Sequence, residues 1–187
     1  MAYCNQTLAG ITLDCTNSLG GIKTVYIANY GDVDGQPTVG ADGMITGITM
    51  RTTDENGEPL SENLLPKFKP YQFRKQTGSM TSTLTVDETA GVNYVSTELS
   101  LVFTKMETAK RVEMSALAIG QLAVIVEDSN GKYWYMGYDD YVSATAGGGN
   151  TGTAKGDGNN YTLTLRDESD TYPYEITKEA VDAVIEK

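Results

Sequence analysis

Two pairs of neighbouring acids are the first residues in this chain whose type and spacing could do chemistry. They are Asp139 with Asp140 and Asp167 with Glu168. Glycosidases use two carboxyl groups of this kind, one as the acid and the other as base or nucleophile. Adjacent side chains on a strand point to opposite faces, and no apolar pocket is evident that would raise the pKa of one partner. We therefore interpret both pairs as solvated surface acids.

Three further motifs could bind ions or phosphate. Residues 32–35 (DVDG) and 128–131 (DSNG) resemble fragments of calcium loops, but both lack the later ligand spacing and the glutamate at the twelfth position. We interpret both as turns. The glycine-rich run 147–152 resembles a phosphate cradle. No buried strand leads directly into it, no helix follows, and Lys155 is at the wrong offset for a Walker loop. The sequence predicts a mobile loop over 143–160.

The chain contains no histidine. Histidine is the commonest general base, orients the nucleophile in Ser and Cys enzymes, and is a preferred zinc ligand. We therefore predict that the protein is not an enzyme, and we expect no catalytic, cofactor or metal site. The two cysteines, Cys4 and Cys15, are favoured as free thiols, because a chain of this length can fold without a disulfide.

Composition sets further bounds. At 187 residues the chain can bury about two-thirds of its unfolded surface, and we expect one domain over residues 1–187. The formal charge is −11, which argues against a nucleic-acid grip based on phosphate neutralisation. The start of the chain does not resemble a signal peptide, and there is no apolar run of about 18 residues. We expect a soluble protein that is made in a cytosol and has no membrane partner.

Alternating apolar and polar residues predict several strands. The clearest covers residues 94–103, where Val95, Thr97, Leu99, Leu101 and Phe103 share one side. Other strands are expected at 23–30, at 44–52 with a bulge near Gly47, at 79–86 and at 161–165. The apolar run 122–126, the turn 128–131 and the aromatic stretch that follows predict a hairpin. The tyrosines over 133–141 indicate a cross-strand core or a subunit seam more than a surface for stacking sugars or bases.

One amphipathic helix is predicted over about 104–119. Thr104 and Glu107 have the spacing of a capping box, and Gly120 is a natural stop. Apolar residues recur three and four positions apart, which predicts a stripe that packs on the preceding strand. The residues of this stripe are Met106, Ala109, Val112, Ala116 and Ile119. A short C-terminal helix is expected over 179–187.

These elements predict a mainly β, α+β fold. We expect an antiparallel β-sandwich or curled barrel with the helix at its flank and a long loop or arm over 53–75. This arm switches charge, with four acids followed by four bases. The eight residues are Asp54, Glu55, Glu58, Glu62, Lys67, Lys69, Arg74 and Lys75. They form either an ordinary solvated face or, as our hypothesis, a contact in which the acids of one subunit meet the bases of the next.

Four segments carry a resemblance to known proteins. They are DCTNSLGGIK at 14–23, TVYIANY at 24–30, KYWYMGY at 132–138, and TGTAK with YTLTL within 151–165. Taken in order, they resemble a structural-protein family of tailed phages and prophages that infect Bacteroides-type bacteria. In element order the chain is similar to the tail tube proteins of long-tailed phages and to the inner tube of type VI secretion.

The resemblance implies a virion protein of the tail that assembles in the bacterial host cytoplasm. Its partners would be further copies of itself in stacked hexameric rings, other tail or connector proteins, and DNA only as passing cargo. Edge strands would join neighbours, the 53–75 arm would clamp them, and the lumen would be acidic. Two alternatives stay open: a head-to-tail connector ring or decoration protein, and a lectin-like β-sandwich whose Tyr-rich hairpin stacks sugars.

Overall fold

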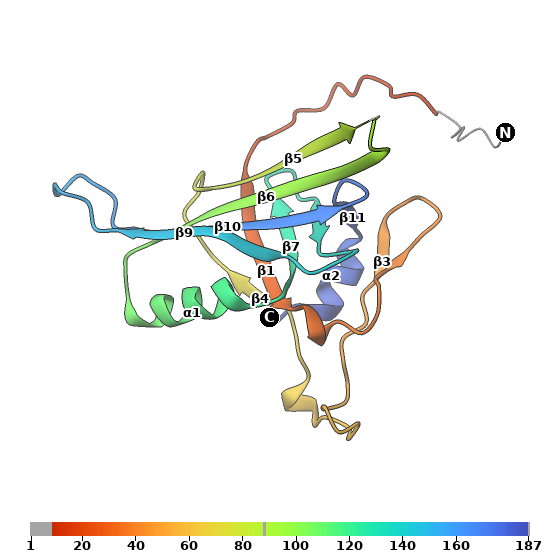
Figure 1. The fold of residues 1–187 in the computed structure, drawn as a ribbon, viewed down its shortest axis with the longest axis horizontal. Coiled ribbons are helices and arrows are strands. Elements are labelled where there is room, and N and C mark those ends of the chain that lie inside the picture. Colours follow the sequence, from red (N-terminus) through yellow and green to blue (C-terminus); the bar gives the residue numbers. More distant parts are fainter. Residues whose placement is uncertain (1–8, 88, 187) are drawn as a thin grey trace.

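Two β-sheets packed face to face form the body of the molecule in a computed structural model, which describes residues 9–87 and 89–186 (Figure 1). Two α-helices, α1 (Thr108–Ile119) and α2 (Lys178–Val184), pack against them. The predicted mainly β, α+β sandwich is therefore confirmed, and within the described residues the two sheets stay open. No helix of the described part has the length and apolar character needed to span a membrane.

The first sheet has four antiparallel strands in the order β5-β6-β10-β9. Their bounds are β5 (Gly78–Asp87), β6 (Val92–Thr104), β10 (Asn160–Ser169) and β9 (Ser143–Asn150). In β6 every second residue from Val95 to Phe103 is buried, as the alternation predicted. One face of this sheet therefore belongs to the core, and the other is left open.

The second sheet has seven strands in the order β2-β3-β11-β8-β7-β1-β4. Its longer strands are β1 (Ile22–Asn29), β7 (Leu122–Asp128) and β8 (Tyr133–Met136). Its short strands are β2 (Thr38–Val39), β3 (Ile45–Gly47), β4 (Lys69–Tyr71) and β11 (Tyr174–Ile176). The apolar run in β7 is buried on both faces, because one face meets the four-stranded sheet and the other meets α2.

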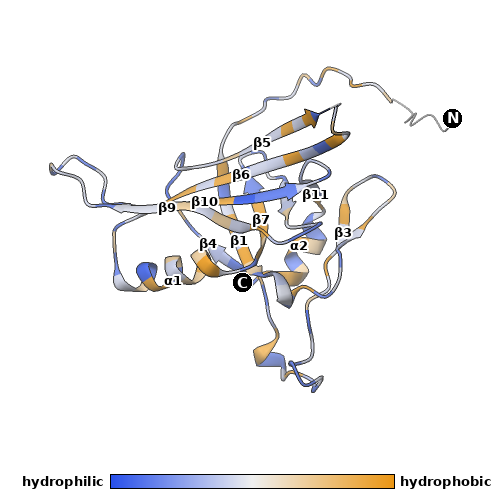
Figure 2. Cartoon of the chain, viewed as in Figure 1, coloured by the Kyte–Doolittle hydropathy of each residue, from blue (hydrophilic) through white to orange (hydrophobic). Residues whose placement is uncertain are grey.

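Two apolar cores result from this three-layer arrangement. The core between the sheets contains alternate β6 and β10 residues such as Leu99 and Leu165, together with Val124 of β7. The second core lies between the seven-stranded sheet and α2, where Ile125 and Val181 are both buried. In Figure 2 orange segments alternate with white or blue ones along β6, and the end of β10 is blue. A fully buried side chain of this size contributes about 1.5–3 kcal/mol of transfer free energy.

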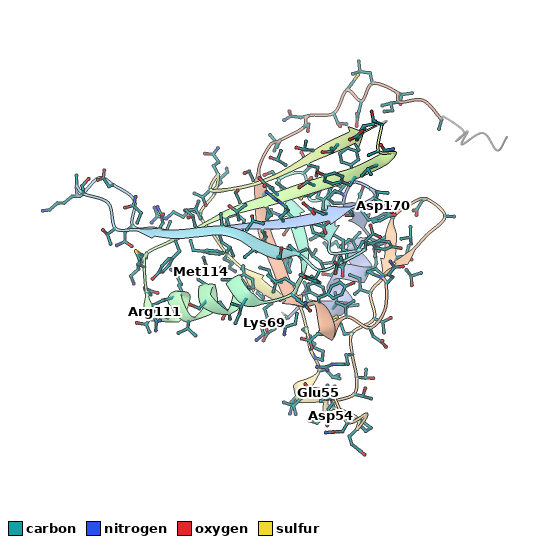
Figure 3. All side chains as sticks on the ribbon, in the orientation of Figure 1. Asp54, Glu55, Lys69, Arg111, Met114 and Asp170 are labelled. Atoms are coloured by element: carbon teal, nitrogen blue, oxygen red, sulfur yellow. The ribbon has the colours of Figure 1, made fainter. Side chains whose placement is uncertain are left out.

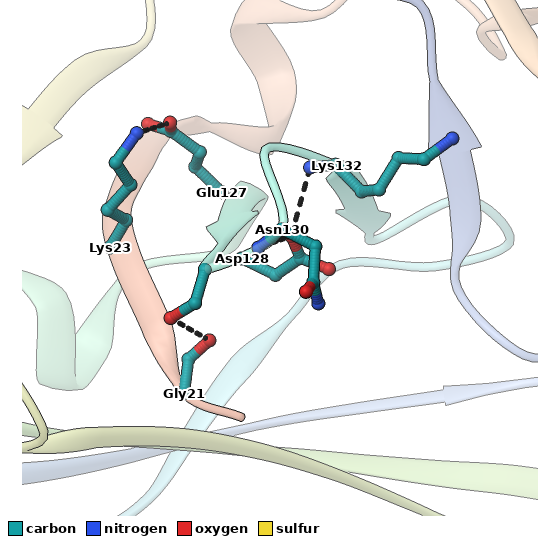
Figure 4. Close-up of polar contacts among 7 residues, drawn as sticks. Gly21, Lys23, Glu127, Asp128, Asn130 and Lys132 are labelled. Atoms are coloured by element: carbon teal, nitrogen blue, oxygen red, sulfur yellow. Dashed lines mark hydrogen bonds and ion pairs between the residues drawn. The ribbon is translucent and has the colours of Figure 1, made fainter. Parts of the chain in front are cut away.

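The turn of the β7–β8 hairpin is the one predicted at residues 128–131 (Figure 4). The Asp128 carboxylate accepts hydrogen bonds from the backbone N–H groups of Asn130 (2.8 Å) and Lys132 (2.9 Å) and from the indole of Trp134 (3.1 Å). Gly131 has a φ of +79°, a conformation in which glycine is favoured. These hydrogen bonds outweigh the effect of burial and hold the pKa of Asp128 below its usual value.

The predicted helix start is wrong by one turn. Thr104 is the last residue of β6 and forms no capping box, because the chain turns at Lys105, which has a φ of +68°. Asn159 fixes that turn by accepting backbone hydrogen bonds from Lys105 (2.7 Å) and Met106 (2.8 Å). The N-cap of α1 is Glu107, whose side chain makes no capping bond.

The predicted buried stripe of α1 is also wrong. Within α1, which is described in full, Leu117 is the one buried residue, and Met114 packs partly against the same core. Val112 and Ile119 of the predicted stripe are instead exposed, by 55% and 88%. The helix covers one side of the sandwich with Leu117 and Met114, whereas the predicted stripe that contains Val112 and Ile119 faces solvent.

Several segment predictions also need correction. The strand expected at 44–52 shrinks to β3, and the loop expected at 143–160 begins with strand β9, which pairs with β10. The arm is shorter than 53–75, because β4 pairs with β1 and so belongs to the sheet. The C-terminal helix forms as α2, with the Thr177 hydroxyl accepting from the backbone N–H of Ala180 at 3.4 Å. The state of the two cysteines stays a prediction, since Cys4 lies outside the described residues.

Candidate inter-subunit surface

Residues 53–68 project from the body as an arm that carries the predicted acids (Figure 3). The arm contains a turn at residues 54–57 and the 3-10 helix η2 (Glu62–Leu64). A second 3-10 helix, η1 (Tyr30–Asp32), lies at the end of β1. The arm returns to the body at Phe68, which is completely buried, donates to Val184 O (3.0 Å) and accepts from Glu186 N (2.9 Å).

The four acids do not all have the same role. The carboxylate of Asp54 accepts backbone hydrogen bonds from Glu58 (2.9 Å) and Asn56 (2.8 Å), which hold its pKa below the usual value and close the turn. Glu55, Glu58 and Glu62 have exposed side chains. Asp54 thus shapes the tip of the arm, while the three glutamates give it its negative charge.

The four bases lie apart from the acids. Lys67 and Lys69 are at the root of the arm, and Arg74 and Lys75 lie in the turn that leads into β5. All four are exposed. Across the described residues, the ion pairs within the chain include none of the eight predicted charges. The fold therefore separates the two charge groups and leaves both open to solvent or to a second copy.

A cleft of about 1080 Å³ lies between the arm and α1. Leu64 and Leu65 line it on the arm side, and Ala116 and Leu117 line it on the helix side. At its wall the hydroxyl of Tyr71 donates a hydrogen bond to Glu113. Burial and this hydrogen bond raise the pKa of Tyr71, so the phenol stays protonated at neutral pH. The cleft therefore has a mixed apolar and charged lining.

The open face of the four-stranded sheet is lined mainly by small hydroxyl side chains. Strand registers place the following residues on it: Ser79, Thr81, Thr83, Thr85, Ser96, Ser100, Thr162 and Thr164. Charges on this face are Asp87 at the end of β5, Glu98, Arg166 and Glu168. Glu98 and Arg166 form an ion pair at 2.5 Å. The face is thus hydrophilic, carries more acids than bases and has no free cluster of bases.

Among the described residues, neither edge of this sheet has a partner strand. β5 and β9 are its outermost strands, and their outward backbone groups have no strand partner among the described residues. β5 also exposes Leu84 by 47% and Val86 by 57% on its core-facing side, beyond the end of the seven-stranded sheet. Long exposed edges with apolar side chains are prone to pair with another chain.

The predicted surface acids are only partly as expected. Asp167 is 2% exposed. Strand β10 continues past Leu165, so the Asp167 side chain lies on the same core-facing side of the strand as Leu165. The solvated interpretation of Asp167 is therefore wrong. Burial raises its pKa, against hydrogen bonds from Gly137 N and the Ser169 hydroxyl, and its Oδ1 atom has no partner in the described structure. Asp139 accepts from the backbone N–H of Asp170 at 3.2 Å, at the surface.

No metal site accompanies these acids: nowhere in the described residues do three potential ligand side chains come together. The Tyr-rich hairpin is a core element, as predicted. Tyr135 is 1% exposed, and Tyr138 packs on Tyr174 with ring centroids 4.5 Å apart. These packed rings leave little of the hairpin's aromatic surface for stacking a sugar.

Comparison of the chain with protein-family models, with curated proteins and with solved structures finds no match. The resemblance to tail tube proteins therefore stays a prediction. Sequence reasoning pointed to the charged arm, but it missed the exposed stripe of α1 and the edge strand β9. The periodicity of α1 was a usable signal for the first. The glycines of residues 147–149 concealed the second, because they resemble a loop.

Proposed function

We propose that this chain is a virion structural protein that self-assembles into stacked hexameric rings and forms the channel of a phage tail tube. The observation that carries the proposal is the four-stranded sheet. One of its faces packs on the molecule's own core, the other is open and hydrophilic, and both edges lack a partner strand among the described residues. Such a sheet can serve as one segment of a continuous cylindrical wall.

Edge pairing would complete this wall. β5 of one copy would lie beside β9 of the next, so that each junction satisfies backbone groups that a single chain exposes. The exposed side chains of Leu84 and Val86 would be covered at the same junction. Because the contact joins two different edges, β5 of one copy and β9 of the next, it repeats head to tail from copy to copy. The repeat closes into a ring when the rotation between neighbouring copies divides a full turn evenly.

The open face would then line the channel. Its hydroxyl groups can hydrogen-bond water, and Arg166 is already paired with Glu98. Free bases that would hold phosphate groups are absent from this described face, so DNA could pass without being bound. The proposed lumen is therefore lined by hydroxyl groups and remains acidic, because Asp87, Glu98 and Glu168 outnumber Arg166 on this face.

The arm supplies a second contact in this proposal. Glu55, Glu58 and Glu62 at its tip would meet Lys67, Lys69, Arg74 or Lys75 of a neighbour, because neither group is paired within the described chain. Exposed ion pairs contribute only about 0–1 kcal/mol each. We therefore expect the arm to set the register between copies, while the apolar surfaces of β5 and α1 provide most of the binding free energy.

Electron microscopy of the purified protein at high concentration tests the proposal. We expect stacked rings that form tubes roughly ten nanometres wide, a width set by sheet spacing and subunit size. The double variant Leu84→Lys with Val86→Lys should remain folded and lose the tubes. Thr81→Lys and Thr83→Lys, on the open face of the same strand, should keep them and serve as the matched control.

Other outcomes separate the alternatives. Single rings that never stack would point to a connector, and a protein that stays monomeric at every concentration would refute self-assembly. Glycan-array binding by a monomer would favour the lectin-like alternative. Charge reversal of Glu55, Glu58 and Glu62 to lysine should weaken ring formation, and mixing this variant with a chain carrying Lys67→Glu and Lys69→Glu should restore it.

A further inference from the structure

The segment before β1 has two apolar side chains in full contact with solvent. Ile11 and Leu13 are exposed by 102% and 92%. They alternate with Thr12 and Asp14, so both apolar groups fall on one side of an extended chain. Residues 9–20 contain no helix or strand. The segment thus has the pattern of a strand-like peptide without the surface that would cover it.

One end of this segment is fixed to the body. Leu19 exchanges two hydrogen bonds with the side chain of Asn130, at 2.8 Å and 3.0 Å. Ser129 N donates to Gly21 O at 3.0 Å. The hairpin turn of β7–β8 therefore holds the chain at residues 19–21. From there the segment runs over the β5 side of the molecule, away from α1 and β9 (Figure 1).

β5 and β9 are the two edges of the four-stranded sheet. A groove of about 480 Å³ lies at the β9 edge, between this strand and α1. Met114 and Ala118 form its helix side, Ala144 of β9 belongs to its strand side, and Leu163 lies at its base. Arg111 lies at the groove as well (Figure 3), and no ion pair in the described part of the chain involves it. The groove thus offers apolar surface beside one positive charge.

We propose that residues 9–14 of one copy bind in the α1–β9 groove of the next copy. Ile11 and Leu13 pack against Met114 and Ala144, and the Asp14 carboxylate, on the outer side of the segment, pairs with the exposed Arg111 at the rim of the groove. The inference rests on the proposed self-assembly, since a junction of β5 with β9 brings this segment beside this groove. We infer that the occupant is a second copy of the chain for three reasons. The segment has apolar side chains that match the apolar groove, its Asp14 is opposite in charge to Arg111, and the segment and the groove lie at opposite edges of the four-stranded sheet.

A labelled peptide tests the contact. The peptide covers residues 9–19 with serine in place of Cys15, and the receptor is the full chain carrying Ile11→Asp and Leu13→Asp, so that its own segment does not compete. Fluorescence anisotropy should show saturable binding. Arg111→Glu or Ala118→Asp in the receptor should weaken binding at least tenfold, and both positions are exposed, so the fold should persist. A peptide with Asp14→Arg should regain affinity for the Arg111→Glu receptor.

A covalent test checks that the contact joins two copies. In a chain with both native cysteines replaced by serine, a Leu13→Cys protein is mixed with an Ala144→Cys protein under mild oxidation. A disulfide-linked heterodimer is expected, with neither protein alone giving the same yield. Thr12→Cys, which points to the other side of the segment, is the matched control and should crosslink less.

The two proposals can fail separately. If the full chain forms tubes but the peptide does not bind, or if binding is indifferent to Arg111→Glu and Ala118→Asp, the groove contact is refuted and the tube proposal stands. If the peptide binds with the expected dependence but rings never form, the contact stands and the tube proposal is refuted.

Discussion

The two helices of this protein treat their apolar residues in opposite ways. α2 is short, yet Ala180, Val181 and Val184 are all buried in the core beneath the seven-stranded sheet. α1 is longer, yet it buries Leu117 and leaves Val112 and Ile119 in solvent. Both sequences have clustered apolar residues, so amphipathic spacing shows that a helix has an apolar face but not whether the same chain covers it.

The difference has a physical cause in what surrounds each helix. α2 lies over the centre of a sheet, and the chain after β11 leads straight into it. α1 lies at the margin of the sandwich, where Leu117 belongs to the core between the sheets and Met114 packs partly against it. The exposed stripe of α1 forms a connected apolar surface, and such surfaces on soluble proteins commonly mark interaction sites.

The strongest test of this contrast introduces the same charge on each helix. Val181→Asp in α2 buries a carboxylate without a partner, and we expect it to cost more than about 4 kcal/mol and to unfold the chain. Val112→Asp in α1 should change the free energy of unfolding by less than about 0.5 kcal/mol. Urea denaturation followed by the fluorescence of Trp134 measures both, and equal losses would abolish the distinction.

A smaller effect is expected within α1 itself. Leu117→Ala removes the buried side chain and should cost about 2–5 kcal/mol, because the sandwich edge cannot close fully around the cavity. Ile119→Ala, two positions away and 88% exposed, is its matched control and should be close to neutral for the single chain. A large loss for Ile119→Ala in dilute monomer would mean that the stripe is covered within the chain.

The helix starts provide a third comparison. Thr177→Ala removes the hydroxyl that accepts from Ala180 N, and we expect it to cost about 1 kcal/mol. Thr108→Ala at the start of α1 is the control, since the hydrogen bonds of the described structure include none from that side chain. Thermal unfolding should show a drop of about 2–4 °C for the first variant only.

The smallest expected change in stability at neutral pH comes from a comparison of the buried Asp167 with the exposed Asp139. Burial raises the pKa of Asp167 above its unfolded value, so the folded state holds the proton more tightly. Asp167 therefore favours folding most at acidic pH, and that contribution is lost as pH rises through the folded pKa. Asp167→Asn should flatten this slope and raise Tm at pH 7.

The control for the acid test is Asp139→Asn at the surface. It should leave the slope of stability against pH unchanged. Both slopes come from urea unfolding measured at intervals from pH 4 to pH 8. A slope that persists in Asp167→Asn would assign the pH dependence to other groups.

Much of the fold was predictable from local patterns. The alternation in β6, the apolar run of β7 and the turn at residues 128–131 each gave the correct element, because side-chain period and turn chemistry are local properties. The strand β9 was not predictable in this way, because residues 147–149 are glycines that form a strand only when β10 lies beside them. Asp167 was misplaced because the length of β10 depends on its pairing with β6.

The features of the candidate inter-subunit surface likewise fall into two groups, those predictable from local sequence and those that depend on the folded chain. The charge switch of the arm, the lack of histidine and the amphipathic character of α1 could all be read from residue type and spacing. Tertiary structure alone decided that the arm's acids and bases stay apart, that the predicted stripe of α1 faces solvent, and that β5 and β9 end as open edges. These features depend on which surfaces remain after the two sheets have packed, and that is a property of the whole chain.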